Sequence, residues 1–131
     1  MITILDKRTL DFIDYLNANY NCEKECLLSV LNGVMSLDEN GEFESAYNDY
    51  EELGIIALTT EMPEKIIDGN SKEASQWYYD NYTLLKLAHE YAHHLQTVGM
   101  VDNPKDEYQN EVVANDWAHK VVKEFLKGKK Q

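Results

Sequence analysis

In the first part of the chain, apolar residues recur every three or four positions, which is the spacing of one face of an α-helix. One such set follows Asp6, whose carboxylate is placed to cap a helix, and a second set spans residues 26–34. The two sets are Leu10, Ile13, Leu16 and Tyr20, then Cys26, Leu27, Val30, Leu31 and Val34. We therefore predict N-terminal helices within residues 1–33.

The middle of the chain has the pattern of strands and turns. Asn40-Gly41 separates two short, roughly alternating segments, and this dipeptide favours a hairpin because both residues tolerate the positive φ of a tight turn. Residues 54–60 form an apolar run bounded by Gly54 and Pro63, which is typical of a strand. A small three-stranded β-sheet is predicted within residues 34–60.

Helical spacing returns in the second half of the chain. After a plausible cap at Ser71, no Pro or Gly occurs until Gly99. We predict a long helix over residues 71–98, a loop, and a final helix over residues 106–127. Helices on both sides of a short run of strands are typical of an α+β domain, and the length of 131 residues fits one such domain over residues 1–131.

The charge of the chain excludes some partners. There are 24 acidic and 12 basic residues, a net charge of −12, and residues 25–64 contain ten acidic residues without a Lys or Arg. Duplex nucleic acid is therefore excluded as a direct partner, because its affinity for proteins comes mostly from cationic side chains. The acidic segment either attracts a basic partner or forms a solvated surface.

Membrane spans and cysteine chemistry are not indicated. No apolar run approaches the length of about 20 residues that a membrane helix needs, and the first residues lack the layout of a signal peptide. The only cysteines, Cys22 and Cys26, match neither a redox pair nor a zinc framework, so we predict buried free thiols in a helix. These features favour a cytoplasmic protein.

The segment that indicates chemistry is His89-Glu90-Tyr91-Ala92-His93, within the predicted long helix. Two histidines four residues apart lie one above the other on a helix, so both imidazoles can bind one Zn²⁺. Glu90 lies one step round the helix, where it can act as general base on a water. His94, about 100° from His93 round the helix, is predicted at the surface or behind a ligand.

A catalytic zinc needs a third protein ligand. The extended motif of metzincins is excluded, because Gln96 and Gly99 stand where that motif requires Gly and His. Glu111, eighteen residues after His93 on the final helix, is the predicted third ligand, and His119 is the alternative. The ligand types favour one Zn²⁺ per chain, although Mn²⁺ and Fe²⁺ are compatible with them.

At these motifs the chain resembles a known family. His-Glu-Tyr-Ala-His, followed by Glu-x-x-Ala-Asn and an aromatic-Ala pair, is similar to the ImmA/IrrE family of gluzincin-type zinc metallopeptidases. The resemblance implies His89, His93 and Glu111 as zinc ligands and Glu90 as catalytic base. It also implies that Asn115, one turn after Glu111, orients a ligand by hydrogen bonding. The fold it implies is helices packed on a small sheet with the metal helix at the centre.

The resemblance covers mainly residues 54–122, and it implies a function as well. Family members act on helix-turn-helix repressors of mobile elements or stress loci, so we expect a zinc endopeptidase that cleaves a basic DNA-binding protein and does not itself contact DNA. The alternative is a non-catalytic, metal-containing regulatory protein whose acidic surface binds a basic partner. A third possibility is a minimal enzyme that needs its partner to assemble a competent groove.

Aromatic residues before the motif are candidates for a substrate groove. Tyr78 and Tyr82 precede His89 by whole helical turns, although such aromatics are commonly core and rim residues. Spacing alone does not choose the donor that stabilises an oxyanion. The groove candidates are Tyr78, Tyr82, Tyr108 and His119, and the donor candidates are Tyr91, Tyr108, His94 and His119.

Overall fold

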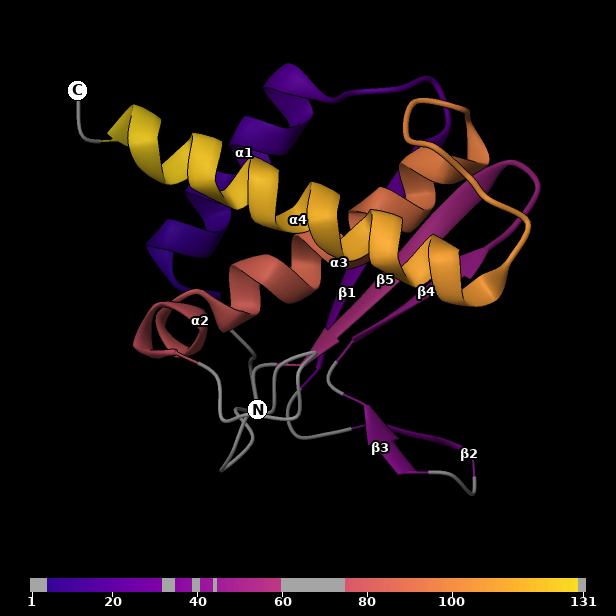
Figure 1. Cartoon of the computed structure of the whole chain (residues 1–131), viewed down its shortest axis with the longest axis horizontal. Helices are drawn as coiled ribbons and strands as arrows, with labels where there is room; N and C mark the ends of the chain where they lie inside the picture. Colours follow the sequence, from indigo (N-terminus) through magenta and orange to yellow (C-terminus); the bar gives the residue numbers. More distant parts are fainter. Residues whose placement is uncertain (1–4, 32–34, 39–40, 44, 60–74, 130–131) are drawn as a thin grey trace.

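The computed structural model describes residues 5–31, 35–38, 41–43, 45–59 and 75–129 (Figure 1). Its elements are α1 (Lys7–Asn19), β1 (Glu25–Leu31), β2 (Met35–Asp38), β3 (Gly41–Phe43), β4 (Ser45–Asp49), β5 (Leu53–Thr59), α2 (Gln76–Asp80), α3 (Tyr82–Thr97) and α4 (Glu107–Lys129). The predicted α+β class is confirmed, with a three-stranded mixed sheet and four helices in the described part of the chain.

The three-stranded sheet has the order β1-β5-β4. β1 and β5 run parallel with Leu27 opposite Ile55, and β4 runs antiparallel to β5 with Tyr47 opposite Ile56. Side chains alternate between the two faces of a strand. Ile56 and Leu58 are buried in the core, whereas Leu27 is 45% exposed. One face of the sheet therefore packs on the helices, and the other faces solvent.

The second predicted N-terminal helix is wrong, because residues 25–31 form strand β1. A short continuous apolar run fits a helix turn and a buried strand equally well, so periodicity does not separate them. These residues form a strand because they pair in parallel with β5, which lies far along the chain. Cys22 and Cys26 are consequently not in a helix, and both are half-buried free thiols.

The predicted hairpin at Asn40-Gly41 is confirmed, although Asn40 itself lies outside the described residues. β2 and β3 pair in antiparallel fashion with Asp38 opposite Gly41. They form a separate two-stranded sheet (Figure 1). The prediction that the hairpin and residues 54–60 form one three-stranded sheet is wrong, since β1 takes the third place beside β5.

The predicted helix over residues 71–98 is interrupted. The Ser75 side chain caps α2, and Asn81, with φ −115° and ψ 15°, separates α2 from α3. Arg8 of α1 donates to the Asn81 side chain, so the break is anchored to the N-terminal helix. The predicted cap at Ser71 lies outside the described residues.

The connection between α3 and α4 agrees with the prediction. Gly99 has φ +80°, a left-handed conformation that favours glycine, and it follows the end of α3. Asp106 Oδ2 accepts a hydrogen bond of 3.3 Å from the Gln109 N–H and caps α4. No helix in the described ranges is long and apolar enough to cross a membrane.

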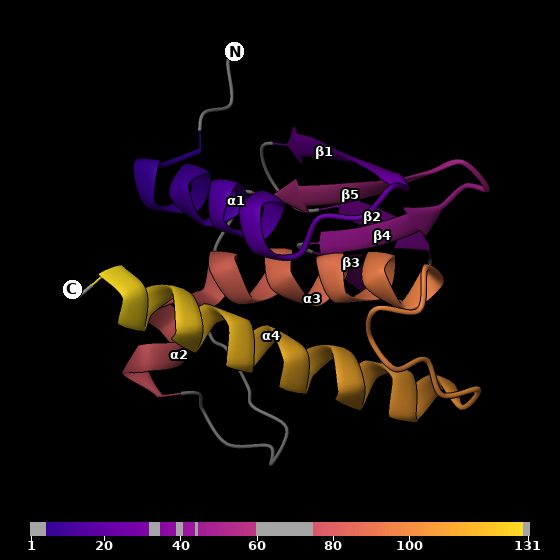
Figure 2. The same ribbon diagram turned by 90° about the horizontal axis from the view of Figure 1, so that it is seen from above.

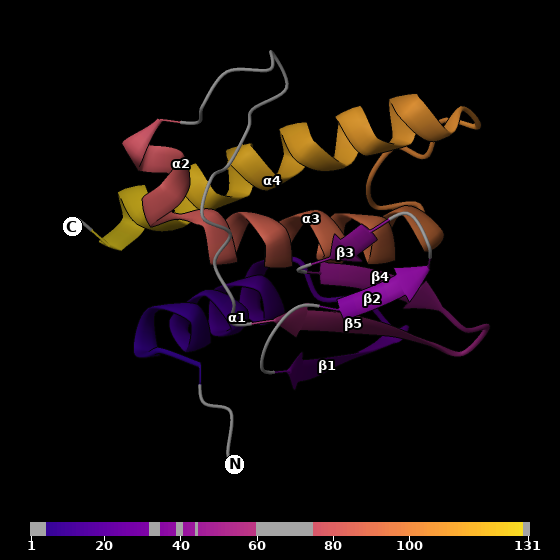
Figure 3. The same cartoon turned by 90° about the horizontal axis from the view of Figure 1, so that it is seen from below.

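Helix α3 occupies the middle of the molecule. Figures 2 and 3 show it between α4 on one side and the sheet with α1 on the other, and α4 runs back along α3 in the opposite direction. Its apolar side chains share one core with residues from α1, β5 and α4, among them Phe12, Leu58 and Val121. Residues on successive faces of α3 therefore reach either the sheet or α4.

Candidate metal centre

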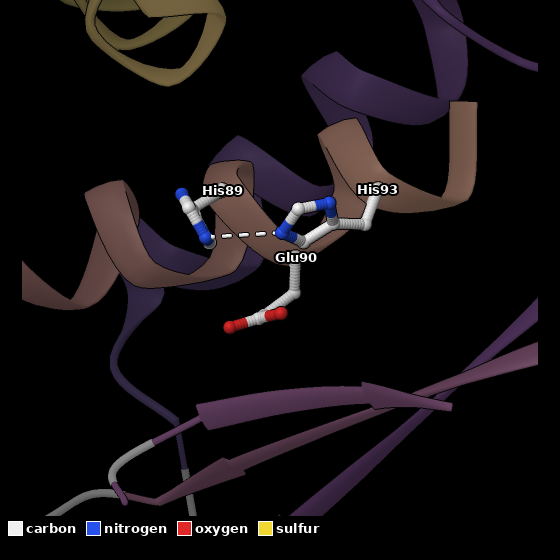
Figure 4. A group of neighbouring side chains, drawn as sticks. All are labelled: His89, Glu90 and His93. Atoms are coloured by element: carbon white, nitrogen blue, oxygen red, sulfur yellow. Dashed lines mark hydrogen bonds between the residues drawn. The ribbon is translucent and has the colours of Figure 1, made fainter. Parts of the chain in front are cut away.

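His89 and His93 are one turn apart on α3, on the side that faces α4. Their Nε2 atoms lie 3.2 Å from each other, and the two rings are edge to face (Figure 4). Glu111 of α4 approaches both, with Oε2 2.8 Å from His89 Nε2 and Oε1 3.2 Å from His93 Nε2. Ala88 and Ala92 of α3 are fully buried, and their small size permits close packing around this helix. Two imidazoles and a carboxylate therefore converge on one point.

The spacing of these donor atoms is close to that around a tetrahedral metal ion. Zinc bonds to histidine nitrogen and carboxylate oxygen of about 2.0–2.1 Å place neighbouring ligand atoms about 3.4 Å apart in a tetrahedron. The separations between His89 Nε2, His93 Nε2 and the Glu111 oxygens are 2.8 to 3.2 Å, with a different Glu111 oxygen facing each histidine. A small outward movement of the exposed Glu111 side chain reaches the ideal value.

Gln96 fixes the orientation of one histidine. Its Oε1 lies 2.8 Å from His93 Nδ1 and can only accept, so Nδ1 carries the proton and Nε2 presents a lone pair. Gln96 is 5% exposed, and its Nε2 donates to the carbonyl oxygens of Asp102 at 3.0 Å and Asn110 at 3.4 Å. These contacts hold His93 in the tautomer that a metal requires.

Glu90 lies beside the histidines but points the other way, from α3 toward the strands (Figure 4). Its side chain is 7% exposed, and its carboxylate belongs to a group with His89 and His93 whose ligand atoms lie within 4.8 Å of one another. Ser45 of β4 donates a hydrogen bond of 2.7 Å to Glu90 Oε2. Burial raises the pKa of Glu90, while the nearby His89 and the Ser45 hydrogen bond lower it.

No known protein family, curated protein or solved structure matches this chain. The chemistry of the site therefore rests on its own geometry. His89, His93 and Glu111 are the donor types of a catalytic zinc, and a buried carboxylate stands next to them without joining the three. On α3, His89, Glu90 and His93 form a group that could hold a metal ion.

An open cleft of about 780 Å³ contains the site. Four predicted residues line it together with the histidines, namely Asn115, Tyr78, Tyr82 and His119. Tyr108 does not line it, since this side chain is 71% exposed and lies outside the cleft. Tyr91 is also turned away, because its hydroxyl donates to the carbonyl oxygen of Tyr20 at 2.8 Å.

The aromatic end of the cleft is separate from the metal ligands. His119 follows Glu111 by eight residues on α4, which places it about 12 Å further along the helix axis. Its ring stacks on Trp77 with centroids 5.8 Å apart and also contacts Tyr78. Burial and the nearby Lys123 lower the pKa of His119. Glu111 rather than His119 contacts both histidines.

The prediction that His94 lies at the surface or behind a ligand is wrong, because its side chain is fully buried on the far side of α3. Tyr47 Oη lies 2.8 Å from His94 Nδ1, and His94 Nε2 lies 3.0 Å from the carbonyl oxygen of Lys24. A Cβ at Gly54 would lie 2.2 Å from Tyr47 Oη and 2.6 Å from His94 Nδ1, so only glycine fits there. His94 thus joins α3 to the sheet.

Two functional contacts were missed by sequence reasoning. Ser45 meets Glu90 only because the pairing of β4 with β5 brings it next to α3, and no local pattern indicates this. The Gln96 contact does have a local signal, since Gln96 follows His93 by three residues and therefore lies on the same face of the helix.

Proposed function

We propose that this chain is a zinc-dependent endopeptidase that hydrolyses a peptide bond in a specific regulatory protein, a helix-turn-helix repressor of a mobile element or stress locus. The observation that carries the proposal is the convergence of His89 Nε2, His93 Nε2 and the Glu111 carboxylate within 2.8 to 3.2 Å, in an open cleft. The resemblance to the ImmA/IrrE family supports the choice of substrate.

The side chains have separate roles in hydrolysis. The chemistry that zinc supplies when bound is polarisation of the scissile carbonyl and a water pKa lowered to about 7. Ser45 occupies Glu90 Oε2, which leaves Oε1 to take a proton from the attacking water and return it to the leaving nitrogen. Burial raises the pKa of Glu90 and makes it a stronger base than an exposed carboxylate.

The cleft suits an extended peptide. It is lined on one side by β4, which is an edge strand of the three-stranded sheet and can pair with a further strand. Its aromatic end, formed by Tyr78, Tyr82 and His119, lies about 12 Å along α4 from Glu111. An extended chain rises about 3.3 Å per residue, so this end would contact a side chain three or four residues from the scissile bond.

A non-catalytic, metal-containing regulatory protein is the second candidate. The hydrogen bond from Ser45 favours it, because a carboxylate already engaged by a hydroxyl is less available as a base. The two functions differ in their need for Glu90. Replacing Glu90 with Gln preserves shape and removes the proton acceptor, so only an enzyme loses its function in Glu90→Gln.

Cleavage of repressors gives the direct test. Zinc-loaded wild type and Glu90→Gln are incubated with purified helix-turn-helix proteins from the same genome, and new chain termini are identified by mass spectrometry. We expect one repressor to be cut at one site by the wild type and not by Glu90→Gln or by wild type treated with chelator. Cleavage that persists in Glu90→Gln would exclude the proposed mechanism, and intact repressors throughout would favour the regulatory protein.

A further inference from the structure

The face of the sheet opposite α3 carries apolar side chains in solvent. On β1, Leu27 is 45% and Leu31 is 40% exposed, and both belong, with the exposed Ser29 between them, to the set of alternate residues that points away from the core. Ile55 of β5 lies opposite Leu27, and Ala57 follows it on the same face. Parallel strands normally have both faces covered, so an open apolar face on the parallel pair β1 and β5 is unusual.

Acidic residues lie at one end of this face. Glu25 is exposed and lies in the same row of β1 as Leu27. The turn from β4 to β5 adds the exposed Glu51 and Glu52, next to Tyr50, whose side chain is 55% exposed. The nearby cation Lys24 does not offset them, because its Nζ is bound to Asp49 and to Thr97 Oγ1, on the α3 side of the sheet.

We propose that this sheet face, defined by Leu27, Leu31 and Ile55 with Glu25 and the β4–β5 turn at its end, docks a basic amphipathic helix of a partner protein. The distance from Leu27 to Leu31 is about 13 Å along the strand. A helix of about nine residues spans it with one apolar stripe. Lys or Arg at the end of that helix would then face the acidic residues.

Charge decides between this partner and a second copy of the chain. Two copies meeting through the same face with their strands parallel would bring their acidic ends together, and in any orientation both copies carry a net charge of −12. Opposite charges on two partners speed their association, whereas like charges slow it. A basic amphipathic helix can contact Leu27, Leu31 and Ile55 with its apolar stripe and can pair its Lys or Arg side chains with the acidic residues at the end of the face.

The docking face is distinct from the cleft. Ser45, Tyr47 and Glu90 lie on the α3 side of the sheet, whereas Leu27 lies on the other side. Figure 2 shows β1 at the edge of the sheet that is remote from α3. A partner can therefore occupy this face while the cleft stays open, and the inference does not require peptide-bond hydrolysis.

The probe is a fluorescent peptide of about 18 residues, built from Leu and Lys at helical spacing. Its binding to the full chain is measured by anisotropy at low and high salt. Two comparison peptides replace Lys with Glu or scramble the order of Leu and Lys. We expect only the amphipathic basic peptide to bind, with an affinity that falls as salt rises.

Substitutions in the protein test whether the peptide binds at the proposed sheet face. Leu27→Asn should weaken it about tenfold, while Leu10→Asn, on α1 with a similar exposure of 48%, should leave it unchanged. Glu25→Lys should weaken it about threefold at low salt, and Glu107→Lys, at an exposed position of α4, should have little effect. Circular dichroism checks that each variant is folded.

Four results would overturn the inference: equal binding by all variants, equal binding of the acidic peptide, no binding at all, or a dimer of the protein alone that Leu27→Asn dissociates. Binding should be the same in Glu90→Gln and Glu111→Ala. Binding of the basic peptide without cleavage of any repressor would contradict only the peptidase proposal. Cleavage of a repressor without binding of the peptide would contradict only this inference.

Discussion

Replacing Gln96 with Met is expected to weaken zinc binding without changing any metal ligand. Gln96 Oε1 accepts a hydrogen bond of 2.8 Å from His93 Nδ1, and Met keeps the length of the side chain but offers only a weak acceptor. Loss of such a contact behind a histidine ligand costs about tenfold to a hundredfold in metal affinity, or about 1.4 to 2.7 kcal/mol. The hydrogen bonds to the carbonyls of Asp102 and Asn110 are lost as well, so the metal-free variant should also be about 1 kcal/mol less stable.

The affinity is measured by competition with a chromophoric chelator, and the stability of the metal-free protein by urea unfolding. Gln109→Met, at an exposed position of α4, is the matched control and should bind zinc as the wild type does. The reasoning is refuted if Gln96→Met and the wild type bind zinc within about twofold of each other, since His93 would then not need its partner.

Three further predictions concern stability. Gly54→Ala should destabilise the fold by about 2 to 4 kcal/mol in urea unfolding, because the new Cβ collides with Tyr47 and His94. The control Gly128→Ala meets nothing within 4 Å and should be neutral or slightly stabilising. Similar unfolding free energies for the two variants would contradict the packing around Gly54. Burial lowers the pKa of His94, so the unfolded chain takes up this proton first on acidification. The unfolding free energy should therefore fall as the pH drops below about 6.5, by at most about 1.4 kcal/mol per pH unit, with a shallower fall in His94→Gln. Zinc at about a hundred times its dissociation constant should stabilise the wild type by about 2.7 kcal/mol in thermal melts but not Glu111→Ala, and an equal effect on both would point to binding elsewhere.

The local parts of the site are predictable from sequence because they depend on one helix. His89, Glu90 and His93 keep their relative positions on any helix, so their spacing is enough to group them on α3. Asp6 as a cap and Gly99 as a helix end are local signals too, and the structure has both.

The remaining features depend on contacts between distant segments. Residues 25–31 form a strand that pairs with β5, and the separate pairing of β4 with β5 places Ser45 beside Glu90. The separation of about 100° between His94 and His93 predicts His94 at the surface or behind a ligand, yet that side of α3 is the one that the sheet covers. Periodicity along one segment carries no information on either contact.

Zinc content after reconstitution tests the central claim most directly. The protein is incubated with excess zinc, desalted, and analysed by elemental mass spectrometry beside His93→Ala, Glu111→Ala and Glu90→Gln. One zinc per chain in the wild type and in Glu90→Gln, with loss in the other two variants, is the expected result. Zinc retained in Glu111→Ala, or none bound by the folded wild type, would contradict a metal centre built from His89, His93 and Glu111.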